Sequence, residues 1–160
     1  MKQSGKIFAF IPVLFIGAVL QFFMVKADSV DTPEKAAMEF ISAYYKLDAG
    51  MAERLCKADS VDGELNLVEA YVKAVNTETE ERGYTPNYMK FALFHVEKET
   101  KIKDDKNVEV KIVARKYRAI RDFYPFVSVL FGLGQPENIE HDLKLIKEDG
   151  KWKVCGFSLL

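Results

Sequence analysis

The apolar and polar positions of this chain form three successive patterns: an unbroken apolar run, then helical stripes, then alternating strands. The apolar run extends from Ile7 to Val25 and contains no charged side chain. As a helix with a rise of about 1.5 Å per residue, it would be roughly 28 Å long, close to the thickness of a bilayer core. The run therefore predicts a segment that lies in a membrane or directs the chain across one.

Two interpretations of residues 1–27 remain open. In the first they form an uncleaved signal anchor, because Lys2 and Lys6 precede the run and positive charge stays on the cytoplasmic side. The rest of this single-pass membrane protein would then lie on the extracytoplasmic, periplasmic side. In the second they form a signal peptide that is cleaved after Ala27, and the protein is secreted. The run is longer than the apolar region of most signal peptides, which is about 7–15 residues, and this favours the anchor.

Helical stripes begin the remaining residues, 28–160, which we expect to form a single α+β domain. Thr32 is a typical N-cap, followed by a proline at the first helical position and an acid in the first turn. Apolar residues at three- and four-residue spacing then predict three helices. The first follows Thr32, a short second one follows Asp48, and the third follows Asp62 and ends at Gly83.

Alternation at a period of two replaces the helical spacing in the second half. Residues 88–102 are rich in aromatic and β-favouring types, and residues 103–107 have the composition of a turn. Residues 108–114 alternate between apolar and other side chains, as in a strand with one buried face. Residues 143–154 form the clearest hairpin, with its turn at Asp149 and the glycine that follows. Three helices and then an antiparallel sheet predict helices packed on one face of that sheet.

Two segments resemble the nuclear transport factor 2-like superfamily, the cone-shaped fold shared by ketosteroid isomerases and polyketide cyclases. Residues 32–50 are similar to the opening helix pair of small bacterial exported members, and residues 147–154 (KEDGKWKV) are similar to the terminal hairpin. The resemblance implies a curved antiparallel sheet with three helices, in a cone-like arrangement. Because the superfamily hosts enzymes, binding proteins and assembly adaptors, it implies no single function.

Charge and composition exclude several partners. Without the three N-terminal lysines, residues 28–160 carry 20 basic and 24 acidic side chains, so we expect no attraction for nucleic acid. The two histidines and two cysteines lack the spacing of a zinc site. We therefore expect neither a metal nor a cofactor.

His95 is a weak candidate for a catalytic acid or base, because it lies in the first predicted strand and could point into a cone-like pocket. The ordinary alternative is a hydrogen-bonded histidine on the sheet. His141, between two acids, is expected at a solvated strand start. Catalytic members of the superfamily use an aspartate, or an Asp–His pair, on strands that face the pocket. At the centres of the predicted strands this chain has no carboxylate, only Phe91, Leu93, Ile112 and Val113. This absence favours a protein that is not an enzyme.

Cys56 and Cys155 invite a disulfide if the domain lies in an oxidising compartment. If Trp152 and Val154 face the helices, however, strict alternation turns Cys155 to the opposite face of the sheet. Gly156 could mark a bulge that resets this alternation. An intramolecular disulfide and a free or intermolecular Cys155 therefore remain equal alternatives.

Residues 123–134 form an uncharged stretch with four aromatic side chains. One interpretation is a buried strand, or a helix that lines the cone. The other is an exposed element that contacts lipid, a membrane protein or a hydrophobic molecule. In the second case three residues would carry the contact: Phe126, Leu130 and Phe131. Tyr44 and Tyr117 are further candidates for binding, because each has a hydroxyl that needs a partner when buried.

These observations favour a membrane-tethered, extracytoplasmic, non-catalytic binding or assembly domain. It would be held to the membrane by residues 7–25 and would contact a membrane protein partner or a hydrophobic ligand. One alternative is a small-molecule enzyme of the isomerase or cyclase type, with His95 as acid or base and Tyr44 or Tyr117 as hydrogen-bond donor. The other is an exported carrier of a lipid-like ligand. A homodimer formed through the sheet is compatible with each of them.

Overall fold

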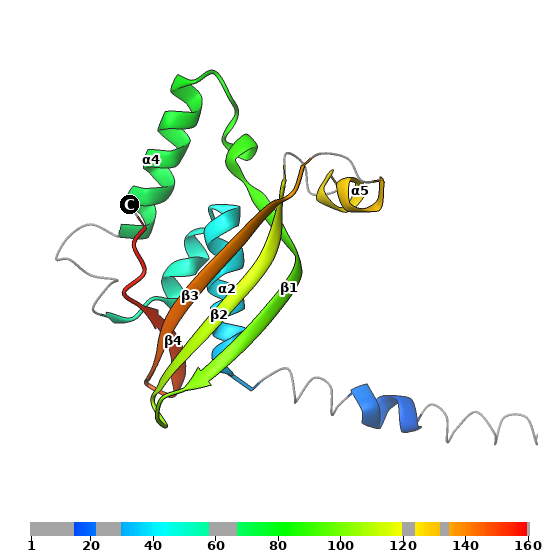
Figure 1. The fold of residues 1–160 in the computed structure, drawn as a ribbon, viewed down its shortest axis with the longest axis vertical. Coiled ribbons are helices and arrows are strands. Elements are labelled where there is room, and N and C mark those ends of the chain that lie inside the picture. Colours follow the sequence, from blue (N-terminus) through cyan, green and yellow to red (C-terminus); the bar gives the residue numbers. More distant parts are fainter. Residues whose placement is uncertain (1–14, 22–29, 58–66, 120–123, 132–134, 160) are drawn as a thin grey trace, which may run out of the picture. The chain divides into compact units, whose positions relative to one another are not determined.

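The computed structural model describes residues 15–21, 30–57, 67–119, 124–131 and 135–159 (Figure 1). The chain divides into two units, Met1–Asp31 and Thr32–Leu160. In the first unit, residues 15–21 are helical. Across the described residues, no helix combines the length and the apolar character needed to cross a membrane. Most of the apolar run 7–25 lies outside those residues, so the expected span stays a prediction.

Helix α2 (Pro33–Lys46) begins as its sequence predicts. Thr32 is the N-cap, and its side-chain hydroxyl accepts a hydrogen bond of 3.2 Å from the backbone N–H of Lys35. The helix ends at Leu47, which has a φ of 54°, a left-handed conformation that commonly closes helices. The apolar stripe of α2 is buried, and it consists of Ala36, Ala37, Phe40 and Ile41.

The remaining helical segments differ in detail from their predicted forms. The short second helix is the 3-10 helix η1 (Ala49–Arg54), whose N-cap Asp48 accepts a hydrogen bond from the backbone of Gly50. The third is α4 (Leu67–Glu81). Residues 86–89, which include part of the expected first strand, form the 3-10 helix η2 (Pro86–Met89) instead. Proline at the start of this segment lacks an N–H donor and favours a turn over a strand.

Four antiparallel strands form one sheet in the order β1-β2-β3-β4. They are β1 (Phe91–Ile102), β2 (Asn107–Arg118), β3 (Glu137–Glu148) and β4 (Lys151–Cys155). A bulge shifts the register of β1 between Phe94 and Glu97. The turn between β3 and β4 places Asp149 and Gly150 at φ values of 50° and 80°, as a two-residue type I′ hairpin requires. The α+β class and the antiparallel sheet are therefore confirmed.

Helix α5 (Tyr124–Phe131) lies between β2 and β3 in the chain and corresponds to most of the uncharged stretch 123–134. The described part of the stretch is thus a helix and not a strand. The side chains of Leu130 and Phe131 at its end are 64% and 68% exposed. The side chain of Phe126 lies outside what the structure describes.

The hydrophobic core lies between α2 and one face of the sheet (Figure 1). Alternate residues of each strand enter it, so Trp152 and Val154 of β4 are both buried. Every residue of this core belongs to the second unit. Residues 28–160 therefore contain a complete core of their own: Ala36, Ala37, Phe40, Ile41, Met51, Leu55, Val68, Val108, Val110, Ile112, Ala114, Ile139, Leu143, Leu145, Trp152, Val154 and Leu159.

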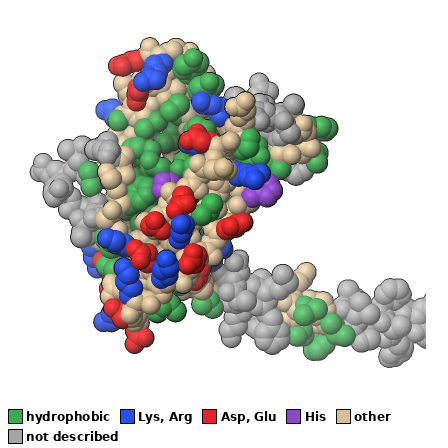
Figure 2. All heavy atoms as spheres, in the orientation of Figure 1, with side chains coloured by type: hydrophobic (Ala, Val, Ile, Leu, Met, Phe, Trp, Pro, Cys, Tyr) green, Lys and Arg blue, Asp and Glu red, His purple; other side chains and the backbone are tan. Residues whose placement is uncertain are grey.

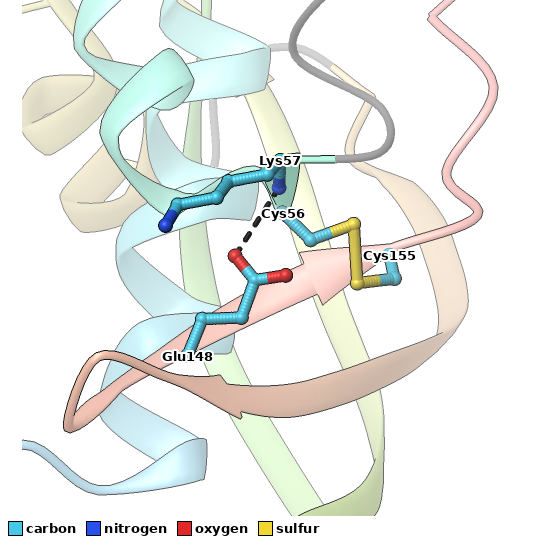
Figure 3. The surroundings of a disulfide bond; sticks show 4 residues. All are labelled: Cys56, Lys57, Glu148 and Cys155. Carbon is cyan, nitrogen blue, oxygen red and sulfur yellow. Dashed lines mark hydrogen bonds between the residues drawn. A yellow bond between two sulfur atoms is a disulfide. The ribbon is translucent and has the colours of Figure 1, made fainter.

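A disulfide joins Cys56 to Cys155, with 5.4 Å between their Cα atoms (Figure 3). Leu55 forms a parallel bridge with Val154, and the backbone N–H of Cys56 donates to the carbonyl of Val154 over 2.9 Å. Because the bridge runs along the edge of β4, the two cysteines are neighbours across it and face the same way. The two side chains therefore meet, and Cys56 is fully buried whereas Cys155 is half-buried.

Lys57 continues this attachment to the β3–β4 hairpin. Its backbone N–H donates to the Glu148 carboxylate over 3.2 Å (Figure 3). Its ammonium contacts the Asp149 carboxylate over 2.8 Å, although both side chains are mostly exposed. Exposed pairs of this kind contribute little to stability, and the disulfide is the covalent link between residues 55–57 and β4.

Cys155→Ser should lower the free energy of unfolding of residues 28–160 by about 2–5 kcal/mol, because the disulfide closes a long loop. The two cysteines are 99 positions apart in the sequence. Chemical denaturation with and without a thiol reductant measures the effect. The reductant should destabilise the wild type by a similar amount and leave Cys155→Ser unchanged. Equal stability of the oxidised and reduced wild type would contradict a disulfide at this position.

Candidate functional site

The apolar rows on the helix-facing side of the sheet end in polar residues at one end. On β2 the buried row Val108, Val110, Ile112 and Ala114 is continued by Lys116. On β3 the buried Leu145 and Leu143 are followed on the same face by His141, Ile139 and Glu137. The register pairs Lys116 with Glu137, and both lie on the same face of the sheet as His141. This end of the sheet is the candidate site.

A tyrosine from α2 meets His141 there. The Tyr45 hydroxyl lies 2.7 Å from Nε2 of His141, and both side chains are half-buried. Burial, with smaller effects from Tyr44 and Glu137, raises the pKa of Tyr45 to about 12. Burial and the nearby Lys116 lower the pKa of His141, while Asp142 opposes them. At pH 7.5 the pair is therefore uncharged, and the tautomer of His141 decides which of the two groups donates the hydrogen bond.

Aromatic rings surround this pair on the helix side. Tyr44 stacks on Tyr71 of α4, with ring centroids 5.4 Å apart and planes 11° from parallel. Phe157, which follows β4, meets Tyr44 edge-on at 5.2 Å and lies 5.8 Å from the His141 ring. Burial and a hydrogen bond with Tyr44 raise the pKa of Tyr71, so its hydroxyl also stays protonated. Elements far apart in the sequence thus converge on one aromatic cluster.

Helix α4 borders an apolar surface next to the aromatic cluster. Figure 2 shows hydrophobic side chains gathered between α4 and the sheet. Of the residues of α4, only Val68 and Thr79 are fully buried, whereas Tyr71, Val72 and Val75 on the same side stay half-buried. Tyr71 and Val75 are four residues apart and therefore share one face of the helix. We call the partly exposed surface formed by this face of α4, the aromatic cluster and the adjoining sheet the aromatic hollow.

The structure brings only some of the predicted site residues to the hollow. Tyr44 lies in it. Tyr117 lies on the opposite face of the sheet from Lys116, where its ring meets Phe94 edge-on at 5.5 Å. His95 is exposed, with a φ of 52° at the bulge of β1. It therefore does not line the hollow as an internal acid or base would.

His141 corrects the sequence analysis most clearly. We expected it at a solvated strand start, but β3 begins four residues earlier and His141 faces the helices. Its two acidic neighbours in the sequence lie on the other face of the strand because side chains alternate. Extending the alternation of Leu143 and Leu145 back by one step would have placed His141 inside. Tyr45 and Lys116 are site residues that the sequence analysis did not single out.

No cluster in the described part of the chain contains three or more His, Cys, Asp or Glu side chains placed to hold a metal ion. The hollow instead offers hydroxyl groups, one imidazole, one ammonium and several aromatic faces. Such a set can bind by hydrogen bonding and by contact with apolar or aromatic groups.

Comparison with known proteins finds similarity at the level of solved structures. No protein-family model and no curated protein matches the chain. A crystal structure of a proposed NTF2-like transpeptidase from Campylobacter jejuni is 16% identical, with a TM-score of 0.45, over 78% of this chain and 97% of that one. An NTF-2 like protein of unknown function from Shewanella oneidensis is 11% identical, with a TM-score of 0.45, over 77% of this chain and 94% of that one. Both proteins are described as NTF2-like. Residues 32–50 and 147–154 of this chain resemble the nuclear transport factor 2-like superfamily. At this similarity we base no argument about activity on either protein.

Stability should decrease as the pH falls through about 6.5, because of His141. Burial lowers the pKa of His141 in the folded state, so the unfolded chain takes up a proton first and is favoured on acidification. This contribution is fully present above the unfolded pKa and is lost between the unfolded and the lower, folded pKa. Melting temperatures measured from pH 7.5 to 5 should show it.

His141→Gln should flatten this part of the pH profile, because an amide does not titrate and can still form a hydrogen bond with the Tyr45 hydroxyl. His95→Gln is the matched control, since His95 is exposed, and it should keep the wild-type profile. Identical profiles for the wild type and His141→Gln would show that His141 titrates alike in the folded and unfolded states.

Proposed function

We propose that this protein is a non-catalytic binding domain that takes a small hydrophobic ligand into the aromatic hollow. The observation that carries the proposal is the uncharged Tyr45–His141 pair, held at 2.7 Å among stacked and edge-on aromatic rings. Small-molecule sites are typically apolar and aromatic, with a few polar groups that fix orientation. The half-buried face of α4 supplies further apolar surface that the sheet does not cover.

The enzyme alternative loses its named residue in this arrangement. His95 is exposed, and Tyr117 lies on the opposite face of the sheet from the hollow. Glu137, the acid whose charge acts on Tyr45, is 68% exposed and forms an ion pair with Lys116. A mostly exposed, ion-paired carboxylate differs from the desolvated carboxylates that abstract protons in closed pockets.

Tethering to a membrane, with the domain on the extracytoplasmic side, is part of the same proposal. The uncharged run from Ile7 to Val25 supports it, as do the two lysines before the run. The Cys56–Cys155 disulfide supports the compartment, because such bonds persist in oxidising spaces. Contact with a membrane protein partner through α5 also belongs to the proposal, and the exposure of Leu130 and Phe131 supports it.

Ligand binding can be tested with Nile red, a neutral dye that fluoresces in apolar surroundings. Residues 28–160 should bind it, and Val75→Glu should weaken binding about tenfold or more, because the new carboxylate would be desolvated beside the dye. Ala74→Glu is the matched control, since Ala74 is exposed on α4. Equal binding by Val75→Glu and the wild type, with equal melting temperatures, would place the dye elsewhere and contradict the proposal.

Tethering can be tested with the full chain expressed in a bacterial host. An anchor predicts that the protein stays in the membrane pellet after carbonate extraction, that its mass includes residues 1–27, and that external protease digests the domain in spheroplasts. A soluble protein that begins at Asp28 would reject the anchor and support cleavage after Ala27. Reduced cysteines together with full protection from the protease would reject the extracytoplasmic location.

A further inference from the structure

Two cations lie side by side at the edge of the aromatic hollow. Lys116 and Arg118 are alternate residues of β2, so both face the helix side, where the register sets Arg118 opposite Phe91. Nζ of Lys116 is 4.9 Å from the centre of the Phe91 ring, and Cζ of Arg118 is 5.3 Å from it. One aromatic face therefore carries two positive groups, each within the range of a cation–π contact.

Neighbouring groups hold both cations in place. Nζ of Lys116 is also 5.6 Å from the centre of the Tyr45 ring, and the side chain is only 16% exposed. Arg118 donates from Nη1 to the backbone carbonyl of Tyr88 over 2.8 Å, and its guanidinium lies 4.1 Å from the centre of the Tyr88 ring. The two charges are thus positioned before any ligand arrives, which lowers the entropy cost of binding.

The local charge is positive although the domain as a whole is acidic. Glu137 forms an ion pair of 3.0 Å with Lys116, and it offsets one of the two positive charges. The Glu137 side chain is 68% exposed, so it can turn toward solvent at little cost when another anion takes its place. Tyr45 and His141 beside the pair are uncharged at pH 7.5 and do not compensate the remaining charge.

The spacing of the two cations suits one small anion. Alternate residues of a strand are about 7 Å apart, and a carboxylate that accepts from two cationic donors at about 2.8 Å each spans a similar distance. The apolar body of the same molecule would then extend past Phe91 toward the stacked Tyr44 and Tyr71 rings. Both ends of such a molecule would have a matching surface.

We propose that the ligand of the aromatic hollow is an anionic amphiphile, with a carboxylate between Lys116 and Arg118 and its apolar chain in the hollow. This rests on the proposed function and narrows it to one class of ligand. The acidic balance of residues 28–160, with 20 basic and 24 acidic side chains, argues against binding to anionic bilayers or nucleic acid through general attraction. The proposed partner of the two cations is therefore a small anionic molecule and not an extended anionic surface.

The test compares decanoate with decanol, which has the same chain length and no charge. Each competes with Nile red for residues 28–160, and isothermal titration calorimetry measures decanoate binding directly. The wild type should bind decanoate at least about tenfold more tightly than decanol, because a charge-assisted contact replaces a neutral one. The doubly substituted Lys116→Met, Arg118→Met protein should lose this preference and retain its affinity for decanol.

Arg115→Met is the matched control, since Arg115 is an exposed cation of β2 on the opposite face. It should keep the preference for decanoate, and melting curves should show all variants folded. Equal affinities of the wild type for decanoate and decanol would overturn the inference while leaving the proposed function intact. An unchanged preference in the double variant would also overturn it. Failure of the wild type to bind Nile red, decanol and decanoate would overturn both the inference and the proposed function. Binding to phosphatidylglycerol vesicles that depends on Lys116 and that decanoate does not weaken would assign the two cations to a membrane instead.

Discussion

The packing of Phe40 and Ile41 of α2 against the sheet determines where the polar groups of the hollow lie. Both side chains are fully buried, which fixes the rotation of α2 about its own axis. One helical turn later the same face carries Tyr44 and Tyr45, because residues four apart lie above one another. On β3, His141 interrupts the buried row between Leu143 and Ile139, and its Nε2 lies 2.7 Å from the Tyr45 hydroxyl. A single packing contact thus aligns the C-terminal end of α2 with His141.

The disulfide matters to the hollow because it fixes the edge of the sheet next to Phe157. Leu55 and Cys56 run parallel to β4 and cover part of its outer edge, which would otherwise present unpaired backbone groups. Two residues beyond Cys155, the Phe157 ring packs on Phe40 and Tyr44. The covalent link therefore stabilises the chain end that closes one side of the aromatic cluster. This explains why a bond remote from the cations at Phe91 still belongs to the architecture of the site.

Local sequence patterns predict the elements of this fold better than its site. The cap at Thr32 and the Asp149–Gly150 turn depend on neighbouring residues, and both form as expected. The site depends on long-range pairing, which a local pattern does not contain. The disulfide was left open because nothing local shows that Leu55 joins the edge of β4. His141 was an error of a different kind, since alternation from Leu143 already assigns it to the buried face.

The two kinds of polar group in the hollow would act differently on a bound molecule. The Tyr45–His141 pair is neutral and already hydrogen-bonded, so a ligand group gains little by replacing that bond. Lys116 and Arg118 carry charge that the exposed Glu137 only partly offsets, so an anion placed there gains more. The orientation of an amphiphile then follows from energetics: the charged end remains at the cations, where water can reach it, and the apolar end occupies the aromatic surface. A neutral apolar molecule would use the same surface without this preference, which is why charge and not chain length should set the specificity of the hollow.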